Sequence, residues 1–165
     1  VLKAAEERQN MVTEGKKAPN IKLSDADGEL VELSKLKGSI VVVYFYPKDD
    51  TSGCTKEALD FTSQISDFEA AGATVLGISP DNEKSHKKFT DKHDLKLRLL
   101  ADVDKKAAEA YEVWVEKSMY GRKYMGVERS TFLIDKTGKV ARAWRKVKVP
   151  GHASEVLAAV KELNT

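Results

Sequence analysis

The stretch VVVYFYPKDDTSGC, residues 41–54, decides the fold because it leads from a buried strand through a short loop into a helix. Residues 39–46 are almost entirely β-branched and aromatic, which is typical of a central strand covered on both faces. Pro47 lacks a backbone N–H and so ends the strand. Cys54, the only cysteine of the chain, then opens the helix. It lies beyond the carboxyl end of a strand, where open α/β sheets carry their reactive groups.

Two interpretations of Cys54 are open at this point. A thiol in the first turn of a helix faces free backbone N–H groups and the positive end of the helix dipole, and both favour the nucleophilic thiolate. Alternatively, Cys54 is a small buried hydrophobic residue, as most free cysteines are. The pattern of strand, loop and helix does not decide between the two.

The sequence on either side completes an α/β pattern. Residues 18–23 and 30–33 predict an N-terminal β-hairpin around the turn residues 25–28. Apolar residues at helical spacing then predict one continuous helix that ends at Ala71-Gly72, with a buried stripe of Cys54, Ala58, Phe61, Ile65 and Phe68. Further strands are predicted over residues 74–78, 98–100, 130–134 and 140–144, and further helices over residues 85–93, 105–111 and 153–163. This order predicts a central mixed β-sheet flanked by helices.

The composition limits the possible classes of function. A chain of 165 residues predicts a single domain, here residues 15–165, preceded by an N-terminal extension over residues 1–14. The net charge of +2 gives no bulk attraction to nucleic acid or to an anionic membrane. The longest apolar run is far shorter than the ~20 residues of a membrane-spanning helix. The histidines show no zinc-ligand spacing with Cys54, so neither a metal nor a cofactor is expected.

A nucleic-acid interface is an alternative, because basic residues gather in two segments, residues 117–123 and 142–148. Alternate residues of a strand point to opposite faces, so these cations are more typical of a solvated rim. Trp144 is able to stack on a base, but an aromatic residue there is more often part of a core or a pocket wall. We therefore expect no nucleic-acid partner.

The loop carries the pattern P-x-x-x-T-x-x-C, in which each residue suits a site around a reactive thiol. Pro47 presets the loop. The Thr51 hydroxyl is able to accept a hydrogen bond from Cys54 and to donate one to an oxygen ligand. Gly53 permits close approach of a small substrate to the backbone.

A carboxylate and a guanidinium complete this set of residues. Glu57 lies one turn after Cys54 and would oppose a thiolate unless a cation intervenes. Arg129, just before the predicted strand 130–134, is the candidate cation, and pairing with Glu57 would hold it rigid beside the thiol. Each residue alone also has an ordinary structural interpretation, as a turn, a helix cap or a solvated charge.

Taken together, these residues resemble the active-site signature of the peroxiredoxins. Residues 44–55, YFYPKDDTSGCT, are most similar to the bacterioferritin-comigratory-protein branch of that family, also called peroxiredoxin Q. Residues 126–134 and 143–147 resemble the second and third signatures of the branch. The likeness implies a thioredoxin-like fold and a thiol peroxidase that reduces hydrogen peroxide and organic hydroperoxides.

The resemblance also implies a role for each residue of the set. Cys54 would be the peroxidatic cysteine, whose thiolate attacks the peroxide and becomes a sulfenic acid. Thr51 and Arg129 would activate the thiolate and the peroxide. Pro47 would shield the sulfur, and Glu57 would orient Arg129.

Further expectations concern the surroundings of the site. Gly53, Tyr46 and Trp144 are expected to contact the substrate. The branch implies a monomer, and the lack of an export signal in residues 1–10 favours the cytoplasm.

The chain departs from the branch where many relatives carry a second, resolving cysteine. One common position is Leu59 in this chain, and another is Thr90; in addition, Ser52 replaces a common proline. An internal disulfide is therefore excluded, and the expected reductant is an external thiol, either thioredoxin or glutathione with glutaredoxin. The same feature supports a second hypothesis, a peroxide-sensing or binding module that relays the oxidation to a partner.

Overall fold

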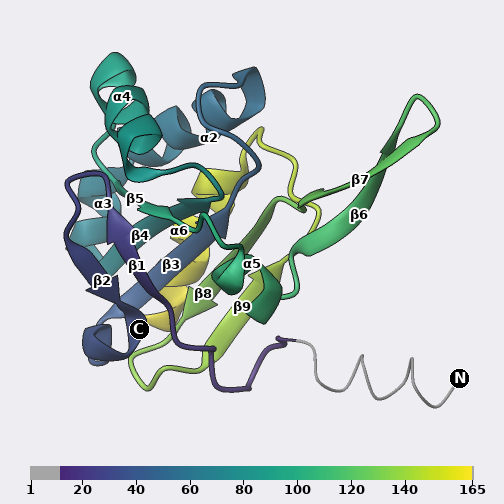
Figure 1. Ribbon diagram of the computed structural model, residues 1–165. Helices are drawn as coiled ribbons and strands as arrows, with labels where there is room; N and C mark the ends of the chain where they lie inside the picture. Colours follow the sequence, from purple (N-terminus) through teal and green to yellow (C-terminus); the bar gives the residue numbers. More distant parts are fainter. Residues whose placement is uncertain (1–11, 165) are drawn as a thin grey trace, which may run out of the picture.

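A seven-stranded sheet with helices on both faces forms the body of the molecule in the computed structural model, which describes residues 12–164 (Figure 1). The strands stand in the order β2-β1-β5-β4-β3-β8-β9. Their bounds are β1 Lys22–Asp25, β2 Leu30–Glu32, β3 Ile40–Phe45, β4 Ala73–Ser79, β5 Arg98–Ala101, β8 Ser130–Ile134 and β9 Val140–Trp144. β4 runs parallel to β3 and β5, and the other pairs are antiparallel. The predicted mixed sheet and N-terminal hairpin are confirmed.

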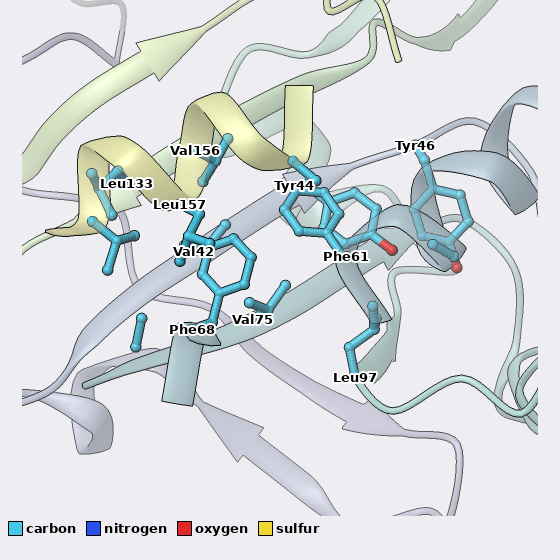
Figure 2. Close-up of a cluster of buried hydrophobic side chains, with 14 of the residues drawn as sticks. Val42, Tyr44, Tyr46, Phe61, Phe68, Val75, Leu97, Leu133, Val156 and Leu157 are labelled. Carbon is cyan, nitrogen blue, oxygen red and sulfur yellow. The ribbon is translucent and has the colours of Figure 1, made fainter. Parts of the chain in front are cut away.

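The helices are η1 Leu33–Leu36, α2 Ser52–Ser63, α3 Ile65–Ala70, α4 Glu83–His93, α5 Lys106–Ala110 and α6 His152–Leu163. Each residue of β3 is buried, as predicted for a central strand. One face of the sheet packs against α2, α3, α4 and α6, and Figure 2 shows side chains of that core: Val42, Tyr44, Phe61, Phe68, Val156 and Leu157. The opposite face packs Val41, Val43 and Phe45 against α5 and Tyr111.

The prediction of one continuous helix from Cys54 to Ala71 is wrong, because the helix is interrupted at Gln64 and forms two helices, α2 and α3. The Gln64 backbone has φ −112° and ψ 10°, and its N–H donates to the carbonyls of Phe61 and Thr62 at the end of α2. The break keeps Phe61 and Phe68 in one core, with ring centroids 5.8 Å apart. Packing of both rings on the sheet therefore outweighs continuation of the helix.

Two elements begin two or more residues away from the predicted start. The helix predicted from residue 85 begins at Glu83, because the Asn82 side chain accepts a 2.8 Å hydrogen bond from the Ser85 N–H and caps the helix there. The first strand starts at Lys22, later than the predicted residue 18. Before it, the Ala18 N–H donates to the carbonyl of Gly138 at 2.9 Å, so this segment is anchored to the turn before β9.

The sequence prediction missed a second, two-stranded sheet, β6 Trp114–Met119 and β7 Arg122–Val127. This hairpin projects away from the body of the molecule (Figure 1). Its turn residues Tyr120 and Gly121 both have positive φ, 53° and 78°, as a tight hairpin turn requires. Most of the hairpin is exposed, so it lacks the apolar alternation that reveals a half-buried strand.

The N-terminal extension predicted over residues 1–14 lies outside the described residues as far as residue 11. Within residues 12–164, no helix is long and apolar enough to cross a membrane.

Candidate active site

Cys54 lies in the first turn of α2, at the end of the loop that leaves β3. The start of the loop is fixed to the sheet, since the Tyr46 N–H donates to the carbonyl of Ile78 at 3.0 Å. The carbonyl of Thr51 accepts from the Thr55 N–H at 2.8 Å and so begins the helix. Cys54 is only 2% exposed, so its thiol is covered, and its place in the first turn puts it near the positive end of the α2 dipole.

Arg129 connects the thiol to a carboxylate. Its Nη2 donates to Cys54 Sγ at 3.3 Å, and its Nη1 donates to Glu57 Oε1 at 2.6 Å. Glu57 is one helical turn after Cys54, so both face the guanidinium from the same side of α2. The pairing that the sequence suggested between these three residues is present in the structure.

Strand pairing brings Arg129 to the thiol from far along the chain. β3 and β8 are antiparallel, and Phe45, the last residue of β3, pairs with Ser130, the first residue of β8. Arg129 therefore lies beside the point where the chain leaves β3 toward the active-site loop. Gly53 lines the approach, because a Cβ atom at Gly53 would lie 3.3 Å from Arg129 Nη2.

Burial dominates the electrostatics of this group. It raises the pKa of Glu57 to about 7, even though the positive charge of Arg129 and its hydrogen bond act in the opposite direction. The second oxygen, Oε2, has no hydrogen-bond partner among the described residues. For Arg129, burial works against the cation, but Glu57 and Cys54 outweigh it and raise the pKa of the guanidinium. Arg129 is therefore a permanent cation beside the thiol.

The remaining loop residues surround Cys54 in different ways. Thr51 is the residue that precedes α2, but its hydroxyl does not cap the helix; it donates to the carbonyl of Lys48 at 2.9 Å. The oxygen lone pairs of Thr51 are still able to accept from a ligand. Pro47 is half-buried at the start of the same loop.

The two predicted aromatic contacts lie in different environments. Tyr46 is 1% exposed, and its hydroxyl donates to Asp49 Oδ1 at 2.5 Å. The buried ring of Tyr46 is therefore hydrogen-bonded to a residue of the active-site loop. Trp144 is partly buried against the core, with Arg142 stacked 4.6 Å from its ring centroid.

A buried polar network that the sequence analysis did not identify anchors the active-site loop to α4. Asp49 Oδ2 lies 2.7 Å from His86 Nδ1 and accepts from the Ser85 hydroxyl at 2.8 Å. The other ring nitrogen, His86 Nε2, lies 2.9 Å from the carbonyl of Leu100 on β5. Spacing in the sequence gave no signal for this network, because Asp49 and His86 are 37 residues apart and an Asp in a turn is ordinary.

A second link joins the same loop to the end of α4 at the surface. Asp50, which has φ 57°, accepts from Lys92 Nζ at 2.6 Å and lies 2.8 Å from His93 Nε2. The lysine and the histidine lower the pKa of the Asp50 carboxyl. The loop between Pro47 and Cys54 is thus held by α4 on two sides.

A hollow of about 530 Å³ adjoins the site. Cys54 is not among its lining residues, which come from the segment between Trp144 and Glu155. The connection runs through Val147, whose N–H donates to the carbonyl of Arg129 at 2.9 Å. In the part of the chain described, no group of three or more His, Cys, Asp or Glu side chains could hold a metal ion.

The fold and this site define a class of protein, a thioredoxin-like thiol peroxidase, and the chain belongs to the AhpC/TSA family, whose pattern matches residues 14–143. It is 49% identical over 150 residues to peroxiredoxin Bcp of Bacillus subtilis, and the aligned region covers 91% of this chain and 96% of that protein. It is 47% identical over 142 residues to peroxiredoxin Bcp of Xanthomonas campestris, covering 86% of this chain and 89% of that protein.

Solved structures agree with these relatives. The bacterioferritin comigratory protein of Xanthomonas campestris, whose structures concern alkyl peroxide reduction, superposes with a TM-score of 0.84 at 46% identity and covers 88% of this chain and 92% of that one. The chain is accordingly a Bcp/PrxQ peroxiredoxin with one cysteine. The thioredoxin-like fold and the peroxidase activity that the signature in residues 44–55 implied are confirmed.

Proposed function

We propose that Cys54 is the peroxidatic cysteine and that its thiolate attacks the terminal oxygen of a hydroperoxide. The S–O bond forms as the O–O bond breaks. Cys54 then carries a sulfenic acid, and the leaving oxygen takes a proton and departs as water or as an alcohol. The observation that carries this proposal is the Arg129 guanidinium, which contacts Cys54 Sγ at 3.3 Å while Glu57 holds it at 2.6 Å.

The other residues of the set support this step. Arg129 is positioned to donate to the peroxide as negative charge moves from sulfur to the leaving oxygen. Thr51 provides a hydroxyl at the start of α2 that can contact the peroxide. Pro47 presets the loop and shields the sulfur, and Glu57 restricts Arg129 to one orientation.

The site suits hydrogen peroxide and organic hydroperoxides. Gly53 leaves room beside Arg129 for a small peroxide group. The neighbouring hollow, whose wall includes Trp144, provides space for the organic part of a larger substrate. The related Xanthomonas campestris protein is described as reducing alkyl peroxides, which supports the same substrate class for this chain.

An external thiol, either thioredoxin or glutathione with glutaredoxin, reduces the sulfenic acid. The chain has no second cysteine, and the positions aligned with resolving cysteines are the exposed Leu59 on α2 and the half-buried Thr90 on α4. A reaction that depends on reduced thiols fits the cytoplasm. A monomer suffices for the chemistry, since one chain supplies Cys54, Arg129 and Glu57.

The test is the intact mass of the reduced protein after mixing with one equivalent of hydrogen peroxide, with and without a sulfenic-acid trap. We expect rapid, stoichiometric trapping in the wild-type chain and none in Cys54→Ser. Turnover with glutathione and glutaredoxin, or with thioredoxin, then identifies the reductant. An unmodified mass after minutes would contradict the proposal. Trapping without turnover by any of these thiols would favour a module that relays oxidation to a partner.

A further inference from the structure

The peptide group between Lys48 and Asp49, in the active-site loop, is hydrogen-bonded at both of its polar ends. Its carbonyl, which belongs to Lys48, accepts from the Thr51 hydroxyl at 2.9 Å. Its N–H, which belongs to Asp49, donates to Asp81 Oδ2 at 2.8 Å. The Ser79 hydroxyl donates to the same Asp81 oxygen at 2.6 Å and fixes that carboxylate. The orientation of this one peptide group therefore determines where the Thr51 hydroxyl lies.

The Asp49 carboxylate anchors the same peptide group inside the protein. Oδ1 accepts from the Tyr46 hydroxyl at 2.5 Å. Oδ2 accepts from the Ser85 hydroxyl at 2.8 Å and lies 2.7 Å from His86 Nδ1. Asp49 is only 8% exposed and His86 is fully buried, so water cannot replace a lost partner without rearrangement. The position of Asp49 therefore depends on these three contacts.

The hydrogen bonds of His86 show where its protons lie. Nε2 lies 2.9 Å from the carbonyl of Leu100, which can only accept, so Nε2 carries a hydrogen. Nδ1 faces Asp49 Oδ2 at 2.7 Å, a distance at which two acceptors need a hydrogen between them. One proton is therefore shared by Nδ1 and Oδ2, and the ring bridges the active-site loop and β5.

The contact with Lys48 limits how Thr51 can act on a peroxide. The hydroxyl hydrogen of Thr51 is used by the Lys48 carbonyl, so its oxygen can only accept from a ligand. The terminal oxygen of a hydroperoxide carries a hydrogen to donate, and Thr51 is exposed at the position just before α2. The same hydroxyl cannot donate to Cys54 Sγ at the same time. Thr51 in this position therefore acts on the peroxide and not on the thiolate.

We propose that His86 is a positioning residue of the peroxidase, which holds the Thr51 oxygen in place by way of Asp49. The link runs from the ring of His86 through the Asp49 carboxylate to the peptide group whose carbonyl binds Thr51. His86 acts from α4 and does not contact the peroxide itself. The proposal rests on the roles of Cys54 and Thr51 given above.

The experiment uses two amides of different reach at position 86. The amide nitrogen of an asparagine takes the place of Nδ1 of a histidine, and that of a glutamine takes the place of Nε2. His86→Asn can therefore keep the contact with Asp49, whereas His86→Gln can keep only the contact with Leu100. We expect His86→Gln to lower the second-order rate constant for oxidation of Cys54 by hydrogen peroxide about tenfold, and His86→Asn to restore most of it. Stopped-flow tryptophan fluorescence measures both.

Alkylation of Cys54 by iodoacetamide separates the positioning of Thr51 from general damage to the site. Iodoacetamide reacts with the thiolate and needs no contact with Thr51, so its rate constant in His86→Gln should stay within about twofold of wild type. In a Thr51→Val background, which lacks the acceptor, His86→Gln should slow oxidation no further. His93→Gln is the matched control on the same helix, because its partner Asp50 is 41% exposed, and it should leave both rate constants unchanged.

Ser85→Ala keeps the test decisive if His86→Gln does not fold. It removes one donor to Asp49 Oδ2 and should slow oxidation by peroxide about threefold, with alkylation unchanged. Unchanged oxidation in these variants, equal losses in His86→Asn and His86→Gln, or a parallel loss of oxidation and alkylation would overturn the proposal. An equal loss in His93→Gln would do the same.

Failure of this proposal can be told apart from failure of the peroxidase itself. If Cys54 is not peroxidatic, wild-type protein forms no trapped sulfenic acid, and both proposals fail. If only the role of His86 is wrong, the sulfenic acid forms in wild-type protein, and peroxide oxidises His86→Gln at the wild-type rate.

Discussion

Glu57 Oε1 accepts a 2.6 Å hydrogen bond from Arg129 Nη1, which leaves the other terminal nitrogen of the guanidinium directed at Cys54. The Arg129 side chain is 16% exposed and that of Glu57 only 2% exposed, so the pair is largely shielded from water. A planar fork with two donors can hold a carboxylate and contact a thiol at the same time, whereas a lysine ammonium cannot match this geometry.

Arg129→Lys should therefore slow the first step although it keeps the charge. We expect the second-order rate constant for oxidation of Cys54 by hydrogen peroxide to fall about 100-fold, the typical effect of removing one positioned donor. Stopped-flow tryptophan fluorescence measures it. Arg98→Lys is the control, because Arg98 pairs with Asp25 at the β1–β5 side of the sheet and should leave the rate constant unchanged. A wild-type rate constant in Arg129→Lys would show that charge alone suffices.

The raised pKa of Glu57 predicts a pH-dependent stability. The ordinary value is 4.5, and the folded protein holds the proton up to about pH 7, so this contribution is complete below pH 4.5 and is lost as the pH rises to about 7. The free energy of unfolding of wild-type protein, relative to Glu57→Gln, should fall across this window by about 3 kcal/mol.

Urea denaturation at a series of pH values measures this difference. Glu69→Gln removes an exposed carboxylate of α3 and should show no such pH-dependent difference from wild type. Parallel curves for wild type and Glu57→Gln would mean that Arg129 keeps the carboxylate ionised throughout.

Two tyrosines of one segment should respond oppositely to loss of the hydroxyl. In the described structure the Tyr44 hydroxyl is buried without a hydrogen-bond partner, whereas the Tyr46 hydroxyl donates to Asp49. Tyr44→Phe should leave the free energy of unfolding unchanged or raise it by up to about 1 kcal/mol, and Tyr46→Phe should lower it by about 2 kcal/mol. Chemical denaturation of Tyr44→Phe and Tyr46→Phe measures the free energy of unfolding of each variant. Equal decreases in the two variants would contradict this prediction.

The buried network of Asp49, Ser85 and His86, which links the active-site loop to α4, should contribute strongly to the stability of the fold. His86→Leu leaves the buried Asp49 carboxylate without one of its donors and should lower the free energy of unfolding by about 3 kcal/mol. The control is His93→Leu on the same helix, where the partner Asp50 is 41% exposed and the loss should be below about 1 kcal/mol. Urea unfolding of both variants compares the two links directly, and a similar small loss in each would show that the buried network does not hold the loop.

The sequence by itself determined the elements whose causes are local. The apolar run of β3, the proline that ends it and the helical spacing after Cys54 place the thiol at a helix start, and the loop signature names its chemistry. The same local signals failed where packing competes with them, as at Gln64, and where exposure removes the alternation, as in the β6–β7 hairpin.

Only the tertiary structure decided which groups meet the thiol. Arg129 contacts Cys54, 75 residues away in the sequence, because Phe45 pairs with Ser130 in the sheet. The register between two distant strands cannot be predicted from the sequence of either strand alone. The network of Asp49 with His86 depends likewise on how α4 docks on the sheet. Local preferences act over a few residues, whereas a site assembled from distant segments is fixed by the burial and strand pairing of the whole chain.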